Sequence, residues 1–130
     1  MPLGPDASPE RPALLVVEDD DDLREAMCEL LSSSAVEAIG VSTGEQAVYW
    51  LMLQPPPLAI VLDLRLPVIN GWDLLAWLRA EPGCVAVPVV IVSGAPLERL
   101  ELALVHGPAA WLRKPVDPRA LVKVVDGLCA

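Results

Sequence analysis

Acidic side chains follow two apolar runs of the sequence. Leu14–Val17 leads directly into Glu18 and Asp19, with three more aspartates behind them, and Ile60–Leu62 ends in Asp63. Five consecutive acids stand where a nucleotide-binding turn would have glycines, which excludes a phosphate-cradling loop. Two carboxylates about 4 Å apart repel by roughly 4 kcal/mol at an effective dielectric of 20, so such a cluster takes up protons or recruits a cation. Oxygen ligands of this kind favour Mg²⁺.

A hydroxyl and an ammonium follow two later apolar runs. Ser93 comes directly after Val90–Val92, and Lys114 lies two residues beyond Leu112. Together with the acids they predict a site that transfers a phosphoryl group to a carboxylate, with Asp63 as the nucleophile. The cation and Lys114 would neutralise phosphoryl oxygens, and Ser93 would donate a hydrogen bond to one of them. Taken singly, each has a plainer interpretation: Asp63 as a turn cap, Ser93 as a turn residue and Lys114 as a solvated charge.

Short apolar runs alternate with segments of helical period along the chain. The predicted strands are Ala13–Val17, Glu37–Val41, Leu58–Leu62, Val87–Val92 and Ala110–Leu112. The predicted helices are Asp21–Ser33, Gly44–Leu53, Trp72–Ala80, Pro96–Val105 and Pro118–Leu128. Strict alternation of this kind predicts an α/β fold, a doubly wound five-stranded parallel sheet with five helices. Its ligand site is expected at the carboxyl ends of the strands, where the acids, the hydroxyl and the ammonium all fall.

Composition and charge limit the possible functions. The chain has 130 residues, of which 54% are hydrophobic and 21% charged, as expected for one globular domain. We expect residues 1–12, which are rich in proline, to form a disordered tail and residues 13–130 to form the domain. The net charge of −9 argues against binding to nucleic acids or membrane surfaces. No apolar run approaches the roughly 20 residues of a membrane span, and three scattered cysteines suggest reduced thiols, so we expect a cytoplasmic protein.

Four short motifs carry a family resemblance. They are Val16-Val17-Glu18-Asp19 with Arg24, then Leu62-Asp63 with Leu66-Pro67 and Asn70-Gly71, then Val92-Ser93-Gly94, and finally Lys114-Pro115. With these motifs in order, residues 13–129 resemble a response-regulator receiver domain, the phosphoacceptor module of bacterial two-component signalling. The resemblance implies a flavodoxin-like receiver fold and a phosphoprotein that acts as a switch, not as an enzyme.

The resemblance also implies roles for the residues of the predicted site. Asp63 would be phosphorylated by a histidine kinase or a histidine phosphotransfer protein, and Ser93 and Lys114 would sense the phosphoryl group. Four groups would bind Mg²⁺: the carboxylates of Glu18, Asp19 and Asp63 and the backbone carbonyl of Arg65. The Lys114–Pro115 peptide bond would be cis. Trp111 stands where the family usually has a Tyr or Phe that swings inward, so it is the candidate switch residue.

Two other classes of function use some of the same residues. A phosphatase of the haloacid-dehalogenase type also uses an aspartyl-phosphate, but it needs a second aspartate two residues after the nucleophile, and here that residue is Arg65. A receiver-like interaction module that is never phosphorylated would lose the acid pair, Asp63 or Lys114, and all of these are present. The second class stays as the alternative.

Surplus apolar residues on the predicted helices indicate contact surfaces. In Gly44–Leu53, an inward stripe of Ala47, Val48 and Leu51 would leave Tyr49, Trp50 and Leu53 for solvent or a partner. It is open whether Trp77 also faces solvent or a partner, because Trp72, Leu75 and Leu78 already form the buried stripe of its helix. In Pro96–Val105, Leu97, Leu100 and Leu104 form one stripe, and His106 follows the helix end. We therefore expect output through docking to a downstream protein or a second copy, without direct contact to DNA.

Overall fold

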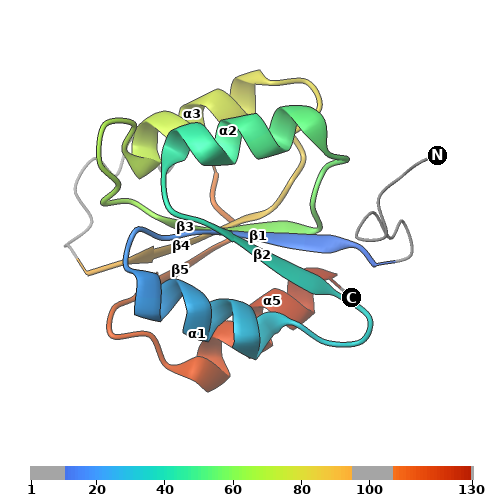
Figure 1. Cartoon of the computed structure of the whole chain (residues 1–130), viewed down its shortest axis with the longest axis vertical. Helices are drawn as coiled ribbons and strands as arrows, with labels where there is room; N and C mark the ends of the chain where they lie inside the picture. Colours follow the sequence, from blue (N-terminus) through green and yellow to red (C-terminus); the bar gives the residue numbers. More distant parts are fainter. Residues whose placement is uncertain (1–10, 95–106, 130) are drawn as a thin grey trace.

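The computed structural model describes residues 11–94 and 107–129, which form a three-layer α/β sandwich (Figure 1). The sheet contains five parallel strands in the order β2-β1-β3-β4-β5. These are β1 (Ala13–Val17), β2 (Glu37–Val41), β3 (Ala59–Asp63), β4 (Val89–Ser93) and β5 (Ala110–Arg113). The described helices are α1 (Asp21–Leu31), α2 (Gly44–Leu53), α3 (Gly71–Ala80) and α5 (Pro118–Cys129). The predicted doubly wound parallel sheet is confirmed.

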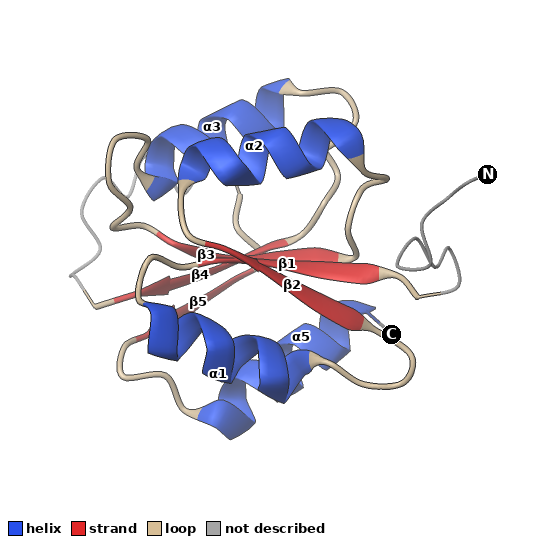
Figure 2. Ribbon diagram, in the orientation of Figure 1, coloured by secondary structure: helices blue, strands red, loops and turns tan. Residues whose placement is uncertain are grey.

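Helices cover both faces of the sheet, with α2 and α3 on one side and α1 and α5 on the other (Figure 2). Side chains alternate between the two layers along each strand: Leu15 and Val17 of β1 pack on the α2 and α3 side, while Leu14 and Val16 pack on the α1 and α5 side. Strands buried on both faces are apolar throughout, which explains the solid apolar runs of the sequence.

Several predictions fall partly or wholly outside the described residues. The predicted helix Pro96–Val105, with its stripe of Leu97, Leu100 and Leu104, lies there, and so does His106. Most of the predicted tail, residues 1–10, also lies outside, so the tail remains a prediction. Arg11 donates hydrogen bonds to the carbonyl oxygens of Ser33 and Val36 at 2.8 and 3.3 Å. The chain is therefore already in contact with the loop between α1 and β2 at that residue.

Two strands lie slightly later in the sequence than predicted. β3 extends to Asp63, which pairs with Val92 of β4, and β4 extends to Ser93, which pairs with Arg113 of β5. The predicted start of β4 at Val87 is wrong, because Val87 N–H bonds the Cys84 carbonyl in a turn. The consequence is that the acid and the hydroxyl of the predicted site are the last residues of paired strands.

Side-chain caps fix where three helices begin. Asp20 caps α1, Thr43 caps α2 and Asn70 caps α3, each accepting a backbone N–H three residues later. The acids after Asp19 thus serve the start of α1, because Asp20 caps the helix and Asp21 and Asp22 lie in its first turn. At the other end, α1 stops at Leu31 and not at Ser33, because the Ser33 hydroxyl accepts the N–H groups of the following loop.

The exposed apolar residues match the sequence expectation in part. Tyr49 and Leu53 are exposed as predicted, and Met52 of the same helix is exposed as well. Trp50, which was expected to face solvent or a partner, and Trp77, whose position the sequence left open, are both half-buried and pack against the core beneath α2 and α3. An indole ring is large enough to reach the core from the flank of a helix, which a simple helical stripe does not take into account.

The three cysteines carry free thiols, with Cys84 buried and Cys28 and Cys129 half-buried. This agrees with the expectation of reduced side chains that behave as small apolar residues.

Candidate functional site

Three carboxylates meet where β1 and β3 end. Glu18 directly follows β1, Asp19 comes next, and Asp63 is the last residue of β3, which pairs in parallel with β1. One carboxylate oxygen from each lies within 4.8 Å of the others. Glu18 and Asp63 are buried, with 0% and 4% of their surfaces exposed, while Asp19 is exposed. The sequence prediction that these acids share one edge is confirmed.

Lys114 reaches this cluster from the loop after β5. Its Nζ lies 2.8 Å from Glu18 Oε1 and 3.2 Å from Asp63 Oδ2. Its backbone N–H donates to the carbonyl of Ser93 at 2.9 Å, and its peptide bond to Pro115 is cis, as expected. The ammonium therefore contacts two of the three acids directly, from the opposite end of the chain.

The pKa of Glu18 is raised from 4.5 to about 7, chiefly by burial. The hydrogen bonds from Lys114 and from the Asp20 N–H act in the opposite direction, and the nearby charge of Asp63 raises the pKa further. For Lys114, burial acts to lower the pKa, but the hydrogen bond to Glu18 and the charges of both acids outweigh burial and raise it. The cluster thus holds an acid that ionises reluctantly beside a lysine that keeps its charge.

Ser93 and Trp111 occupy neighbouring strands at this edge of the sheet. Ser93 is buried at the end of β4, one residue beyond Val92, the register partner of Asp63. Trp111 is half-buried in β5, and its ring centroid lies 5.8 Å from that of Trp72 at the start of α3, with the planes tilted by 50°. The predicted hydroxyl is therefore close to the acids, and the candidate switch aromatic is in contact with a second indole.

Arg65 contributes through its backbone. Its N–H donates to Asp63 Oδ1 at 3.0 Å, while its side chain is exposed. The two oxygens of Asp63 are thus held by different groups, Oδ1 by the Arg65 amide and Oδ2 by Lys114. The role of the Arg65 carbonyl as a metal ligand stays a prediction.

Two residues support the site in ways that sequence reasoning did not assign. Arg24 donates from Nη1 to the Glu18 carbonyl at 3.0 Å and pairs through Nη2 with Asp21 at 2.6 Å. Gly71 brings the start of α3 against β3, because its N–H bonds the Leu64 carbonyl and a Cβ there would lie 2.5 Å from the Asp63 carbonyl oxygen. Both residues stand in the motifs noted above, and this was the only signal available in the sequence.

The donor set determines what the cluster is suited to bind. It offers carboxylate oxygens alone, from two buried acids and one exposed acid, and such ligands suit a hard divalent cation that keeps part of its water shell. The cluster therefore fits the magnesium site that is expected from the sequence. None of the described helices is long and apolar enough to span a membrane.

Comparisons with known proteins agree with this geometry. Protein Rrf1 of Nitratidesulfovibrio vulgaris is 33% identical over 113 residues, which cover 87% of this chain and 79% of Rrf1. The DNA-binding response regulator MtrA of Mycolicibacterium smegmatis is 33% identical over 114 residues, which cover 86% of this chain and 48% of MtrA. The crystal structure of a response regulator receiver protein from Pseudomonas putida superposes with a TM-score of 0.80 at 31% identity, covering 90% of this chain and 97% of that one.

The family model of the response regulator receiver domain matches residues 14–126, a span that runs from β1 into α5 and contains every residue of the acid cluster as well as Ser93 and Lys114. The chain therefore belongs to the response regulator receiver family of two-component signalling, as a phosphoacceptor switch and not a classical enzyme.

Proposed function

We propose that Asp63 accepts a phosphoryl group from the phosphohistidine of a histidine kinase or a phosphotransfer protein in a magnesium-dependent reaction. The observation that carries this proposal is the contact of Lys114 Nζ with Asp63 Oδ2 at 3.2 Å, beside two further carboxylates. A buried acid with an ammonium on one oxygen is suited to receive a group that brings negative charge with it.

Four groups would hold the magnesium ion: the carboxylates of Glu18, Asp19 and Asp63 and the backbone carbonyl of Arg65. The three carboxylates support this assignment because they lie within 4.8 Å of one another and provide only oxygen ligands. When bound, Mg²⁺ would neutralise charge on the oxygens of the incoming phosphoryl group.

The transfer step follows from the chemistry of the carboxylate. One oxygen of Asp63 attacks phosphorus, a P–O bond forms, and the P–N bond to the donor imidazole breaks. The imidazole leaves with the electron pair and takes a proton from solvent. Lys114 then donates to a phosphoryl oxygen in place of Asp63 Oδ2, and Ser93 donates its hydroxyl hydrogen to another. Ser93 and Trp111, which lie on neighbouring strands, are proposed to carry the change from the site toward the surface.

Output is proposed to occur through altered docking to a downstream protein in the bacterial cytoplasm. Support comes from the exposed apolar stripe of α2, where Tyr49, Met52 and Leu53 are 70%, 72% and 62% exposed. The DNA-binding activity in the name of MtrA is not carried over, because the match covers only 48% of that protein. The net charge of −9 also disfavours contact with a phosphate backbone.

The proposal is tested by transfer of labelled phosphate from a phosphorylated histidine phosphotransfer domain. The parent chain is expected to take up the label with Mg²⁺ and to lose this ability in EDTA. Asp63→Asn is expected to take up none, while Asp73→Asn, an exposed acid of α3, is the matched control and takes up label like the parent. Equal labelling of Asp63→Asn and the parent would overturn the assignment. A complete lack of labelling with every donor would favour a receiver-like module that works unphosphorylated.

A further inference from the structure

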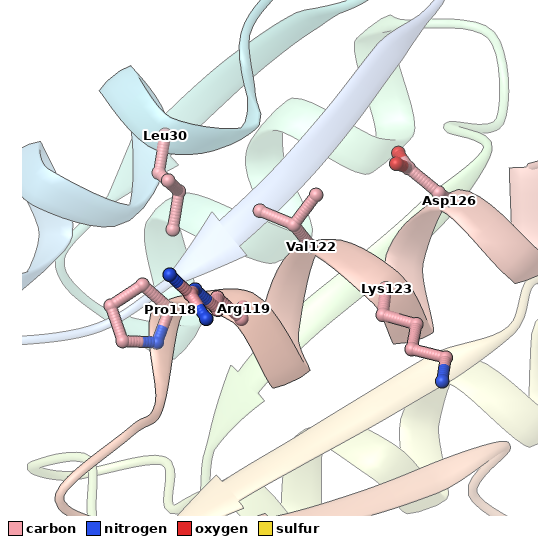
Figure 3. Close-up of a pocket in the computed structure, with 6 residues that line it drawn as sticks. All are labelled: Leu30, Pro118, Arg119, Val122, Lys123 and Asp126. Carbon is pink, nitrogen blue, oxygen red and sulfur yellow. The ribbon is translucent and has the colours of Figure 1, made fainter.

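An open groove runs between α1 and α5, on the helical layer away from α2 and α3 (Figure 3). It has a volume of about 490 Å³ and is lined by Leu30, Pro118, Arg119, Val122, Lys123 and Asp126. Leu30 extends from α1 toward α5 with 42% of its surface exposed, and Val122 is half-buried opposite it. The floor of the groove is thus apolar and accessible to solvent.

The outer edge of α1 is acidic. Asp22, Glu25 and Glu29 are spaced by three and four residues, which places them on one outward stripe of the helix beside Leu30. All three are exposed, and none forms an ion pair with any residue in the described ranges. Three negative charges therefore flank one side of the apolar floor without a cation to balance them.

The outer edge of α5 is basic. Arg119 and Lys123 are four residues apart, so they share a face of the helix, and both are exposed. Their side chains also make no ion pair within residues 11–94 and 107–129, although the acids of α1 belong to the same face of the molecule. Asp126 lies three residues beyond Lys123, which leaves this edge with one net positive charge. In a chain with 18 acids and 9 bases, an unpaired basic edge is unusual.

We infer that this face binds a second copy of the same chain through a twofold axis that passes through the groove. A twofold rotation of this kind sets α1 of one copy over α5 of the other, and the same contact is then made twice. Each acidic edge faces a basic edge, and Leu30 and Val122 of both copies cover the apolar floor. The acids and bases that stay apart within one chain are paired only between two chains.

The size of the face determines the strength of this association. Helices of 11 and 12 residues are about 17 and 18 Å long, so the pair presents less than the roughly 800 Å² per partner of a stable interface. The dimer is therefore transient, concentration-dependent and weakened by salt, because exposed charges contribute to it. The proposed contact uses neither Asp63 nor Lys114, so dimer formation can be tested independently of phosphorylation.

Sedimentation velocity of the full chain at low salt, over roughly 10 to 500 µM, tests the inference. The parent is expected to show a weight-average sedimentation coefficient that rises with concentration. Reversing the basic edge with Arg119→Glu and Lys123→Glu, or the acidic edge with Glu25→Lys and Glu29→Lys, is expected to weaken association about tenfold or more. Glu45→Lys on α2, across the sheet, is the matched control and leaves association unchanged.

Mixing the two reversed variants provides the decisive comparison. One variant then carries acids on both edges and the other carries bases on both, so the mixture is expected to associate although each variant alone does not. Both variants remain net negative, so overall charge cannot produce this result. Far-UV circular dichroism checks that the exposed substitutions leave the fold intact. A parent that stays monomeric, a reversal without effect or a mixture that fails to associate would each overturn the inference.

Discussion

Lys114 Nζ lies closer to Glu18 than to Asp63, at 2.8 Å against 3.2 Å. The ammonium therefore neutralises a proposed magnesium ligand as well as the proposed phosphoacceptor. If Mg²⁺ binds as proposed, the ammonium and the metal would compete for the carboxylate of Glu18, and phosphorylation would supply Lys114 with a different anionic partner. The proposed function therefore predicts that metal binding, phosphoryl transfer and the position of Lys114 depend on each other.

Removal of the ammonium is expected to strengthen magnesium binding. In Lys114→Ala, Glu18 and Asp63 lose the only cation that contacts them among the described residues, so the repulsion within the acid cluster is relieved by the metal alone. We expect the Mg²⁺ affinity to rise by about threefold to tenfold, a modest gain because the lysine side chain is 26% exposed. A magnesium titration followed by tryptophan fluorescence measures this change. Lys123→Ala on α5 is the control, and an affinity that falls in Lys114→Ala would contradict the competition.

The raised pKa of Glu18 makes the stability of the metal-free protein depend on pH. The unfolded chain releases this proton near pH 4.5, whereas the folded chain keeps it until about pH 7. Between these values the folded state binds more protons, so this group's contribution to the free energy of unfolding falls as pH rises. Denaturant unfolding in EDTA at about pH 5 and about pH 8 is expected to show that the parent loses stability relative to Glu18→Gln.

Glu25→Gln, an exposed substitution in α1, is the matched control for this experiment. If the stability of the parent relative to Glu18→Gln stays constant with pH, or rises as pH rises, this would be incompatible with a buried acid that ionises late.

Any side chain at position 71 is expected to destabilise the fold. A Cβ there would lie 2.4 Å from Leu64 Cα and 2.5 Å from the Asp63 carbonyl oxygen, so α3 would have to move away from β3. We expect Gly71→Ala to lower the free energy of unfolding by about 1 to 3 kcal/mol, as measured by denaturant unfolding. Gly127→Ala in α5 is the control: nothing lies within 4 Å of its Cβ, and we expect a gain of about 0.5 to 1 kcal/mol. Equal effects at the two positions would show that the close approach of α3 to β3 does not explain why position 71 is a glycine.

Val68 has a left-handed backbone in the loop between β3 and α3. Its φ is 64°, which is unfavourable for a β-branched residue, and its side chain is 88% exposed and gains little from packing. Val68→Asn is therefore expected to stabilise the fold by about 0.5 to 1 kcal/mol in thermal or denaturant unfolding. Val85→Asn, at another exposed loop valine, should give no such gain. Destabilisation by Val68→Asn would show that Val68 makes a contact that its exposure does not reveal.

Alternation of apolar runs and helical periods was enough to predict the parallel sheet and the order of the described strands and helices along the chain. β2 and α2 begin and end at the predicted residues, because Thr43 and the flanking polar residues are strong local signals. The ends of β3 and β4 were placed too early, since the pairing of Asp63 with Val92 and of Ser93 with Arg113 is a long-range property. Periodicity within one segment carries no such information.

The acids and Lys114 of the site were found from their positions at strand ends, but their individual contacts were not. That Lys114 bridges two acids, and that Arg24 holds the Glu18 carbonyl, depends on side-chain reach across elements. The packing of Trp50 and Trp77 against the core could not be predicted from a helical stripe, because a stripe describes only the direction of a side chain and not the size of the indole. The steric reason for Gly71 likewise becomes visible only when α3 lies against β3.

Intact-mass spectrometry after incubation with acetyl phosphate shows directly whether Asp63 is the phosphoacceptor. The parent chain is expected to gain a single adduct of about 80 Da with Mg²⁺ and none in EDTA. Asp63→Asn is expected to show no adduct under the same conditions, while Asp22→Asn, an exposed acid of α1, gains it like the parent. An adduct that persists in Asp63→Asn with the same yield and the same dependence on Mg²⁺ would show that another residue accepts the phosphoryl group.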